Sequence, residues 1–217
     1  MDSYLKHYIN GKWVDSIGGK RHEVISPSTE EPCTEITLGT QADVDAAVSA
    51  ARQAFKTFSQ TSREERIALM NRIIEEYKKR IPDFAKSMAA EMGAPVSFAT
   101  MAQAPAGLGG FLGTLPALEN FAFKEQHGAN TVVYEPIGVV GLITPWNWPL
   151  NQIALKVAPC IAAGNTMVLK PSEECPGNAA IFAEVMDAAG VPPGVFNLVQ
   201  GDGPTVGAAI SAHPDVD

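Results

Sequence analysis

The sequence predicts an α/β protein: an incomplete doubly wound parallel sheet, preceded by a helical N-terminal region that begins with a small β-hairpin. Two observations carry this prediction. After residue 137, short apolar runs alternate with helical patterns at the spacing of β-α units. Before residue 128, apolar residues recur three or four positions apart, which is typical of amphipathic helices.

The first predicted element is a hairpin at residues 8–14. Its turn is Asn10-Gly11, and both residues tolerate the positive φ that a type I′ turn requires. Helices with recognisable ends follow, because capping residues precede the apolar periodicity and glycine closes it. The start and stop signals are Thr40 with Asp43, Ser62 with Glu65, Pro82, and Gly93. Residues 95–123 contain several Gly and Pro, which predicts a broken or tightly packed helix.

The C-terminal part predicts three β-α units with right-handed crossovers. The expected order is strand 137–143, helix 149–163, strand 166–170, helix 177–190, strand 195–199 and helix 204–212. Pro136 separates an outlying strand at residues 132–134 from the first buried one. Strand 195–199 is expected to form an exposed edge that a further strand would cover.

Composition excludes several classes of function. The chain has 217 residues and a formal net charge of −8, and its Lys and Arg residues are scattered, so neither a nucleic-acid footprint nor a polybasic membrane patch is expected. Apolar stretches are too short for a membrane span. Three cysteines without a Cys-x-x-Cys pair indicate a reducing, cytoplasmic setting, and the four histidines have no metal-ligand spacing.

Two polar motifs follow successive strands, at the edge where open α/β sheets bind ligands. Asn147 lies in a Pro-Trp-Asn-Trp-Pro turn, and a fixed side-chain N–H suits an oxyanion hole, although such an Asn is often only a turn former. Lys170 and Glu173 suit the hydroxyls of a ribose, or form a plain surface ion pair. Gly201-Asp202-Gly203-Pro204-Thr205-Val206-Gly207 departs from the Gly-x-Gly-x-x-Gly fingerprint.

Together, Pro-Trp-Asn-Trp-Pro and Lys-Pro-Ser-Glu resemble the aldehyde dehydrogenase family, over essentially the whole chain. The resemblance implies NAD(P)-dependent oxidation of an aldehyde to a carboxylic acid through a Cys thiohemiacetal, with Asn147 as the catalytic amide of the oxyanion hole. It also implies NAD as the cofactor, with NADP as the alternative. The implied cofactor-binding residues are Ile143, Thr144, Pro145, Trp146, Asn147, Lys170, Ser172, Glu173, Gly203 and Gly207.

The family pattern also implies what this chain lacks. The nucleophilic Cys and the general-base Glu map past Asp217, and Cys33, Cys160 and Cys175 are interpreted as structural. The expected division is 1–127 as hairpin and helical part of the nucleotide-binding domain, 128–136 as a strand of the oligomerisation arm, and 137–217 as the first three β-α units, with the catalytic domain absent.

The chain alone is therefore expected to be inactive, and the alternative is a truncated fragment that acts only as a binding or interaction module. Family members form homodimers or homotetramers and take an aldehyde substrate. The part of the aldehyde tunnel expected in this chain is the surroundings of Met101, Leu108, Phe111 and Trp148.

Overall fold

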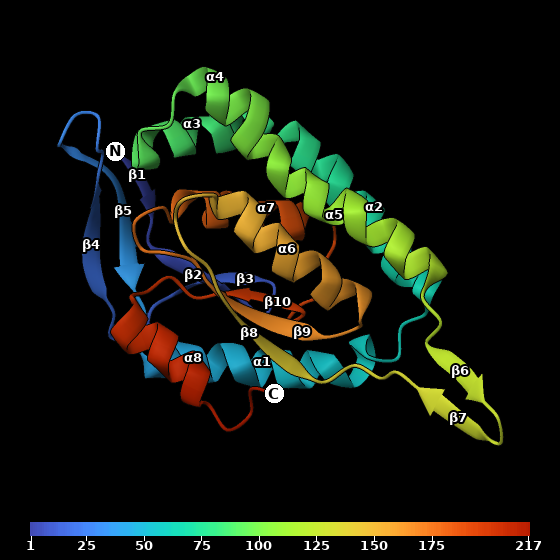
Figure 1. Ribbon diagram of the computed structural model, residues 1–217. Coiled ribbons are helices and arrows are strands. Elements are labelled where there is room, and N and C mark those ends of the chain that lie inside the picture. Colours follow the sequence, from blue (N-terminus) through green and yellow to red (C-terminus); the bar gives the residue numbers. More distant parts are fainter.

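The computed structural model describes all 217 residues and contains a five-stranded sheet with the order β3-β2-β10-β9-β8 (Figure 1). Strands β8 (Val139–Ile143), β9 (Thr166–Lys170) and β10 (Phe196–Leu198) are parallel to one another. Strands β2 (Lys6–Ile9) and β3 (Lys12–Asp15) form an antiparallel hairpin that continues the sheet beyond β10. The predicted α/β class with a parallel three-stranded centre is confirmed.

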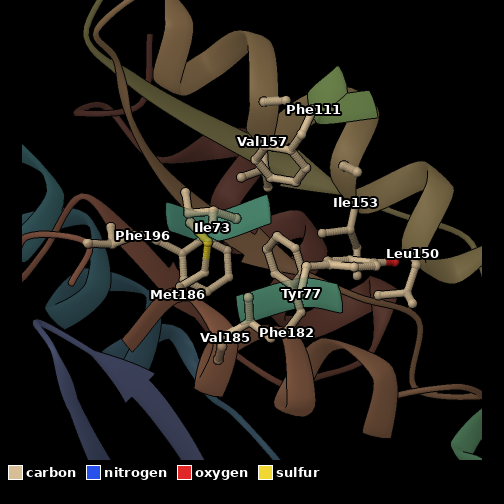
Figure 2. Packing of buried hydrophobic residues seen from close by; sticks show 14 of the residues in the cluster. Ile73, Tyr77, Phe111, Leu150, Ile153, Val157, Phe182, Val185, Met186 and Phe196 are labelled. Atoms are coloured by element: carbon tan, nitrogen blue, oxygen red, sulfur yellow. The ribbon is translucent and has the colours of Figure 1, made fainter. Parts of the chain in front are cut away.

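Helices cover both faces of this sheet, as a doubly wound fold requires (Figure 1). One face carries the larger core cluster, built around Tyr77, Phe182 and Phe196 (Figure 2). Its helices are α2 (Arg63–Lys79), α3 (Ile81–Met92), α5 (Ala104–Asn120), α6 (Pro149–Ala162) and α7 (Gly177–Ala188). The opposite face packs on α1 (Gln41–Phe58) and α8 (Ala208–Ala212), which follows the π-helical turn η2 (Gly203–Gly207).

The N-terminal hairpin occupies the sheet edge that the sequence left open, so the expectation of an exposed edge at residues 195–199 is wrong. Leu198 of β10 pairs with Tyr8 of β2. The hairpin is also held by side chains, because the Asn10 backbone N–H donates to Asn197 Oδ1 at 2.9 Å and Tyr8 Oη donates to Asp187 Oδ1 at 2.8 Å. The outer edge of β8, at the other end of the sheet, is contacted by Asp217, whose N–H donates to the Val139 carbonyl at 2.9 Å.

Local start and turn signals behave as the sequence predicts. Asn10 and Gly11 adopt φ of 53° and 73°, and Gly93 ends α3 at φ 67°. The Asp43 carboxylate accepts from the Thr40 backbone N–H at 2.8 Å, so it closes the first turn of α1. Ser62 and Glu65 make the reciprocal pair of bonds at the start of α2.

The predicted helical region contains three strands that the sequence reading missed. β1 (Asp2–Tyr4), β4 (Lys20–Ile25) and β5 (Pro32–Leu38) form a separate sheet in the order β1-β5-β4. Beyond α5, β6 (Lys124–His127) pairs with β7 (Asn130–Val133) in an exposed hairpin that projects from the body (Figure 1). The predicted strand at 132–134 therefore overlaps one arm of this hairpin.

Residues 96–120 form one long helical rod whose regularity is interrupted, as expected from its glycines and prolines. A short α-turn, α4 (Val96–Phe98), leads through the π-helical turn η1 (Ala99–Gln103) into α5. Glycines let α5 approach its neighbours, since a Cβ on Gly110 would lie 3.0 Å from Ala154 of α6. Phe111 is fully buried against Phe182 at 6.2 Å between ring centroids, so its expected place beside an aldehyde tunnel is wrong.

Replacing Gly107 by Ala should destabilise the fold by about 1–3 kcal/mol, because the core must shift to admit a methyl group. A Cβ at this position would lie 2.3 Å from Tyr77 Oη, which itself donates to the Ala104 carbonyl at 2.6 Å. Gly109 in the same helix is the matched control: a Cβ there meets nothing within 4 Å, so Gly109→Ala should stabilise by about 0.5–1 kcal/mol. Chemical denaturation of both variants measures the two signs, and equal effects would contradict the tight packing of α5.

Candidate functional site

The predicted site residues lie where β8 and β9 end side by side. Ile143, the last residue of β8, is in register with Lys170, the last residue of β9. The Thr144 backbone N–H extends this ladder by donating to the Lys170 carbonyl at 3.1 Å. Carboxyl ends of parallel strands open onto a crevice in which α/β proteins bind ligands. The two polar motifs therefore share one edge of the sheet.

Lys170 and Glu173 form a salt bridge at this edge. Lys170 Nζ lies 2.8 Å from Glu173 Oε2, and the Lys side chain is nearly buried whereas 27% of the Glu side chain is exposed. Burial by itself would raise the pKa of Glu173, but the hydrogen bond and charge of Lys170 outweigh it and lower the pKa, while the charge of Asp202 works in the raising direction. Glu173 is thus an ionised, partly exposed acceptor.

The glycine-containing turn η2 packs against the same strand ends. Its first residue follows Asp202, whose Oδ1 accepts from the Thr205 backbone N–H at 2.7 Å and so fixes the start of the turn. A Cβ on Gly207 would lie 3.7 Å from Lys170 Cδ and 4.0 Å from Ile143 Cδ1, while one on Gly203 would meet nothing within 4 Å. Ile143, Lys170 and Gly207 therefore converge, and Gly203 leaves the backbone beside them open to a ligand.

Buried polar groups anchor the loop that carries Glu173, and the sequence reading did not identify them. Both carboxylate oxygens of Glu91 accept from the Gly177 backbone N–H, at 3.2 and 3.1 Å, where α7 begins. Gln200 Nε2 donates to the Pro176 carbonyl at 3.3 Å. The available signal was a polar residue on the apolar face of a helix, because Glu91 follows buried Met88 by three positions.

The Pro-Trp-Asn-Trp-Pro turn presents Asn147 to solvent. Its side chain is exposed and makes no hydrogen bond, whereas its backbone carbonyl accepts from Gln103 Nε2 at 3.3 Å. Trp148 packs edge-on against Phe98 with ring centroids 5.7 Å apart. Trp146 is 53% exposed, so only the Trp148 indole packs against another aromatic side chain here.

The other residues predicted for the cofactor site differ in exposure and in hydrogen bonding. Pro145 is exposed beside Trp146, and the buried Thr144 hydroxyl has no hydrogen-bond partner. The Ser172 hydroxyl accepts from the Glu174 backbone N–H at 3.3 Å, which shapes the loop around Glu173. The structure thus brings Ile143, Thr144 and Lys170 together and leaves Pro145 and Trp146 projecting outward.

No cysteine in the chain has the environment of a nucleophile. Burial raises the pKa of all three thiols, and that of Cys160 reaches about 12. A thiolate needs a neighbouring cation or helix N-terminus that lowers its pKa.

No group of three or more His, Cys, Asp or Glu side chains is arranged to hold a metal ion. None of the helices is both long and apolar enough to cross a membrane.

Proteins of one family match this chain along nearly its whole length. The model of the family described as "Aldehyde dehydrogenase family" matches residues 13–217. The 3-succinoylsemialdehyde-pyridine dehydrogenase of a Pseudomonas species is 53% identical over an alignment of 218 positions, which covers 100% of this chain and 46% of that protein. The chain also covers 46% of a putative aldehyde dehydrogenase of Staphylococcus aureus, at 49% identity. It therefore spans about half the length of these curated relatives.

Two solved structures share both the fold and the sequence. An aldehyde dehydrogenase of Bartonella henselae superposes with a TM-score of 0.97 at 48% identity, covering 100% of this chain and 46% of that one. A mutant of aldehyde dehydrogenase C of Pseudomonas syringae, solved in complex with NAD⁺ and octanal, has a TM-score of 0.96 at 46% identity. The match covers 98% of this chain and 44% of that one.

Proposed function

We propose that this chain, which belongs to the aldehyde dehydrogenase family, is the N-terminal NAD-binding part of an enzyme that oxidises an aldehyde to a carboxylic acid. One observation carries the proposal: Asn147 and the Lys170–Glu173 pair follow the adjacent carboxyl ends of β8 and β9. A relative that is 46% identical was solved with NAD⁺ and an aldehyde, which supports both ligand classes.

The residues at the strand ends fit an adenosine ribose of NAD. Glu173 offers an ionised acceptor to the ribose hydroxyls, and Lys170 holds that carboxylate in place at 2.8 Å. Gly203 and Gly207 allow the backbone of η2 to approach the adenine end, since neither position carries a side chain. Ile143, Thr144, Pro145, Trp146 and Ser172 complete the proposed cofactor surface. The nicotinamide, when bound, accepts the hydride from the substrate.

In the proposed reaction Asn147 stabilises the negative charge that develops on the substrate oxygen. Its carboxamide N–H groups are exposed and uncommitted, so they are available to donate to an oxyanion. A cysteine thiolate adds to the aldehyde carbon, and a glutamate later activates water. We place both groups outside this chain, because the environments of Cys33, Cys160 and Cys175 raise their pKa values.

The proposal includes the organisation of the longer protein. Residues 1–127 and 137–217 contribute to the nucleotide-binding domain, and residues 128–136 belong to an arm that pairs subunits of a homodimer or homotetramer. The exposed β6–β7 hairpin supports this role. The acidic composition and the free cysteines of the whole chain favour a cytoplasmic location for the protein. The competing function is a binding or interaction module without catalysis.

Aldehyde-dependent reduction of NAD separates these functions. A longer protein that contains this sequence should catalyse it, whereas a 217-residue chain of verified mass should not. Turnover by the short chain would overturn the assignment of the nucleophile outside it. Absence of both turnover and NAD binding in the longer protein would favour the interaction module.

Glu173→Gln should raise the affinity for NADP relative to NAD by at least about tenfold, because it removes a negative charge from the place where the 2′-phosphate would lie. Asp202 leaves one carboxylate near this position, so the preference should weaken rather than reverse. Isothermal titration of the longer protein with both dinucleotides measures the ratio. Glu174→Gln, which neutralises an exposed neighbour that forms no salt bridge, is the control. An unchanged ratio in Glu173→Gln would remove Glu173 from the ribose site.

A further inference from the structure

The segment Val96–Gln103 makes two contacts with the turn that carries Asn147, and neither is explained by the cofactor site. Gln103 Nε2 donates to the Asn147 carbonyl at 3.3 Å. One residue further on, the Trp148 ring meets the Phe98 ring edge-on, with an angle of 79° between the ring planes. The turn is therefore held from one side at two successive residues by α4 and η1.

The π-helical turn η1 determines which side chains of the segment Val96–Gln103 face the loop that carries Asn147. The Ala104 backbone N–H donates to the Ala99 carbonyl, a five-residue step that replaces the usual step of four. Such insertions shift the side chains that follow and are frequent at functional sites. Here Gln103 is 5% exposed and faces the interior, whereas Met101, two positions earlier, is 77% exposed.

Burying the carboxamide of Gln103 lowers stability unless its polar atoms form hydrogen bonds. Gln103 Oε1 is buried and has no hydrogen-bond donor in the structure. An unsatisfied buried acceptor lowers stability, and an apolar side chain of similar volume would avoid this. The bond from Nε2 to the Asn147 carbonyl is the one interaction of this side chain that an apolar residue could not supply.

We propose that Gln103 is a positioning residue that fixes the peptide between Asn147 and Trp148 and thereby aims the Asn147 carboxamide. The side chain of Asn147 has no hydrogen bond of its own, so its direction depends on the backbone that carries it. The catalytic meaning of this contact rests on the proposed function, in which Asn147 donates to the oxyanion. The contact itself can be tested without activity.

Fluorine NMR of the chain labelled with 5-fluorotryptophan tests the contact directly. The chain has three tryptophans, of which Trp146 and Trp148 flank Asn147 and Trp13 lies in the N-terminal hairpin. Gln103→Met should displace the Trp146 and Trp148 resonances and leave that of Trp13 unchanged. Gln103→Leu also lacks the N–H donor, so it should produce the same displacement and serves if the Met variant does not fold.

The matched control is Gln200→Met. Gln200 is also a buried glutamine whose Nε2 donates to a backbone carbonyl and whose Oε1 has no partner, but it holds Pro176 rather than Asn147. The Gln200→Met variant should leave the Trp146 and Trp148 resonances in place. Unchanged resonances in both Gln103 variants, or equal displacement in Gln200→Met, would overturn the proposal.

Kinetics of the longer protein separate this inference from the proposed function. Gln103→Met should lower kcat about 10- to 100-fold and change the KM for NAD by no more than about threefold, since the shifted carboxamide acts on the reacting oxygen while Lys170 and Glu173 stay in place. Loss of NAD binding together with kcat would reveal a general structural defect and overturn the positioning role. If the resonances shift while Asn147→Ala retains full activity, the contact stands and the proposed function fails.

Discussion

Asn147→Ala should lower kcat for aldehyde oxidation by the longer protein about 10²- to 10³-fold, because loss of one oxyanion donor typically has this effect. The exposed side chain makes no hydrogen bond within the chain, so its removal should leave folding unchanged, and the loss of NAD affinity should be small because the other proposed cofactor residues stay in place. An effect on kcat without an effect on cofactor binding identifies an interaction that forms only in the transition state. Steady-state kinetics with NAD at saturation, paired with titration of NAD, measure both quantities.

The control for this variant is Asn71→Ala, which removes an exposed carboxamide from α2, away from the strand ends. It should leave kcat unchanged within about twofold, as a surface substitution does. Full activity of Asn147→Ala would contradict the oxyanion role and would reduce the turn to a structural feature. A parallel fall in thermal stability would instead mean that the carboxamide supports the fold.

Elements with local signals were predictable from the sequence. The alternation of β8, α6, β9 and α7 follows from apolar runs of different length and period, and the caps at Thr40 and Ser62 mark helix starts within their own first turn. Their physical determinants lie within about four residues, so a single chain displays them. The boundaries of these elements deviate by no more than about two residues from those expected.

Elements that depend on distant partners were not predictable. β2 joins β10 across some 190 positions of sequence, and nothing in Tyr8 or Leu198 indicates that pairing. β4 reads Lys-Arg-His-Glu-Val-Ile and buries only Val24, so its amphipathic alternation is too weak to be recognised. Both strands acquire their stability from tertiary contacts rather than from intrinsic propensity.

The same distinction applies to the site. Asn147, Lys170 and Glu173 follow strand ends, so position along the chain already suggests a role for them. Gln103 and Glu91 are single polar residues within helices. The spacing of Glu91 from Met88 suggests the apolar face, but the sequence does not show which groups either side chain contacts there. The π-helical turn and the packing of α3 against α7 decide their environments, and both are consequences of the assembled fold.

Glu91→Gln should stabilise the chain by about 3 kcal/mol near pH 8 and much less near pH 4.5. Burial raises the pKa of Glu91 from 4.5 to about 7, although hydrogen bonds from Thr34 and Gly177 oppose this. Between these two values the folded state holds a proton that the unfolded state has released, so stability falls as pH rises from about 4.5 to 7. A pKa of about 7 in the folded state, against 4.5 in the unfolded state, corresponds to about 3 kcal/mol once both states are ionised.

The glutamine removes this dependence because it is neutral at every pH while its carbonyl oxygen can still accept from the Gly177 N–H. The informative quantity is the difference in unfolding free energy between variant and wild type at each pH. This difference cancels the contribution of His7 to stability, because His7 is present in both proteins. Burial lowers the pKa of His7, so its contribution is lost as pH falls through about 6.5, whereas the Glu91 contribution is lost as pH rises. Urea denaturation at several pH values supplies the difference.

Glu119→Gln is the reference for this measurement, since Glu119 is exposed on α5 and its carboxylate makes no hydrogen bond. Its difference from wild type should stay near zero across the range. A difference for Glu91→Gln that is constant with pH would mean that the Glu91 carboxyl titrates alike in both states. In that case Glu91 holds the start of α7 through hydrogen-bond geometry alone, and its protonation has no influence on the loop that carries Glu173.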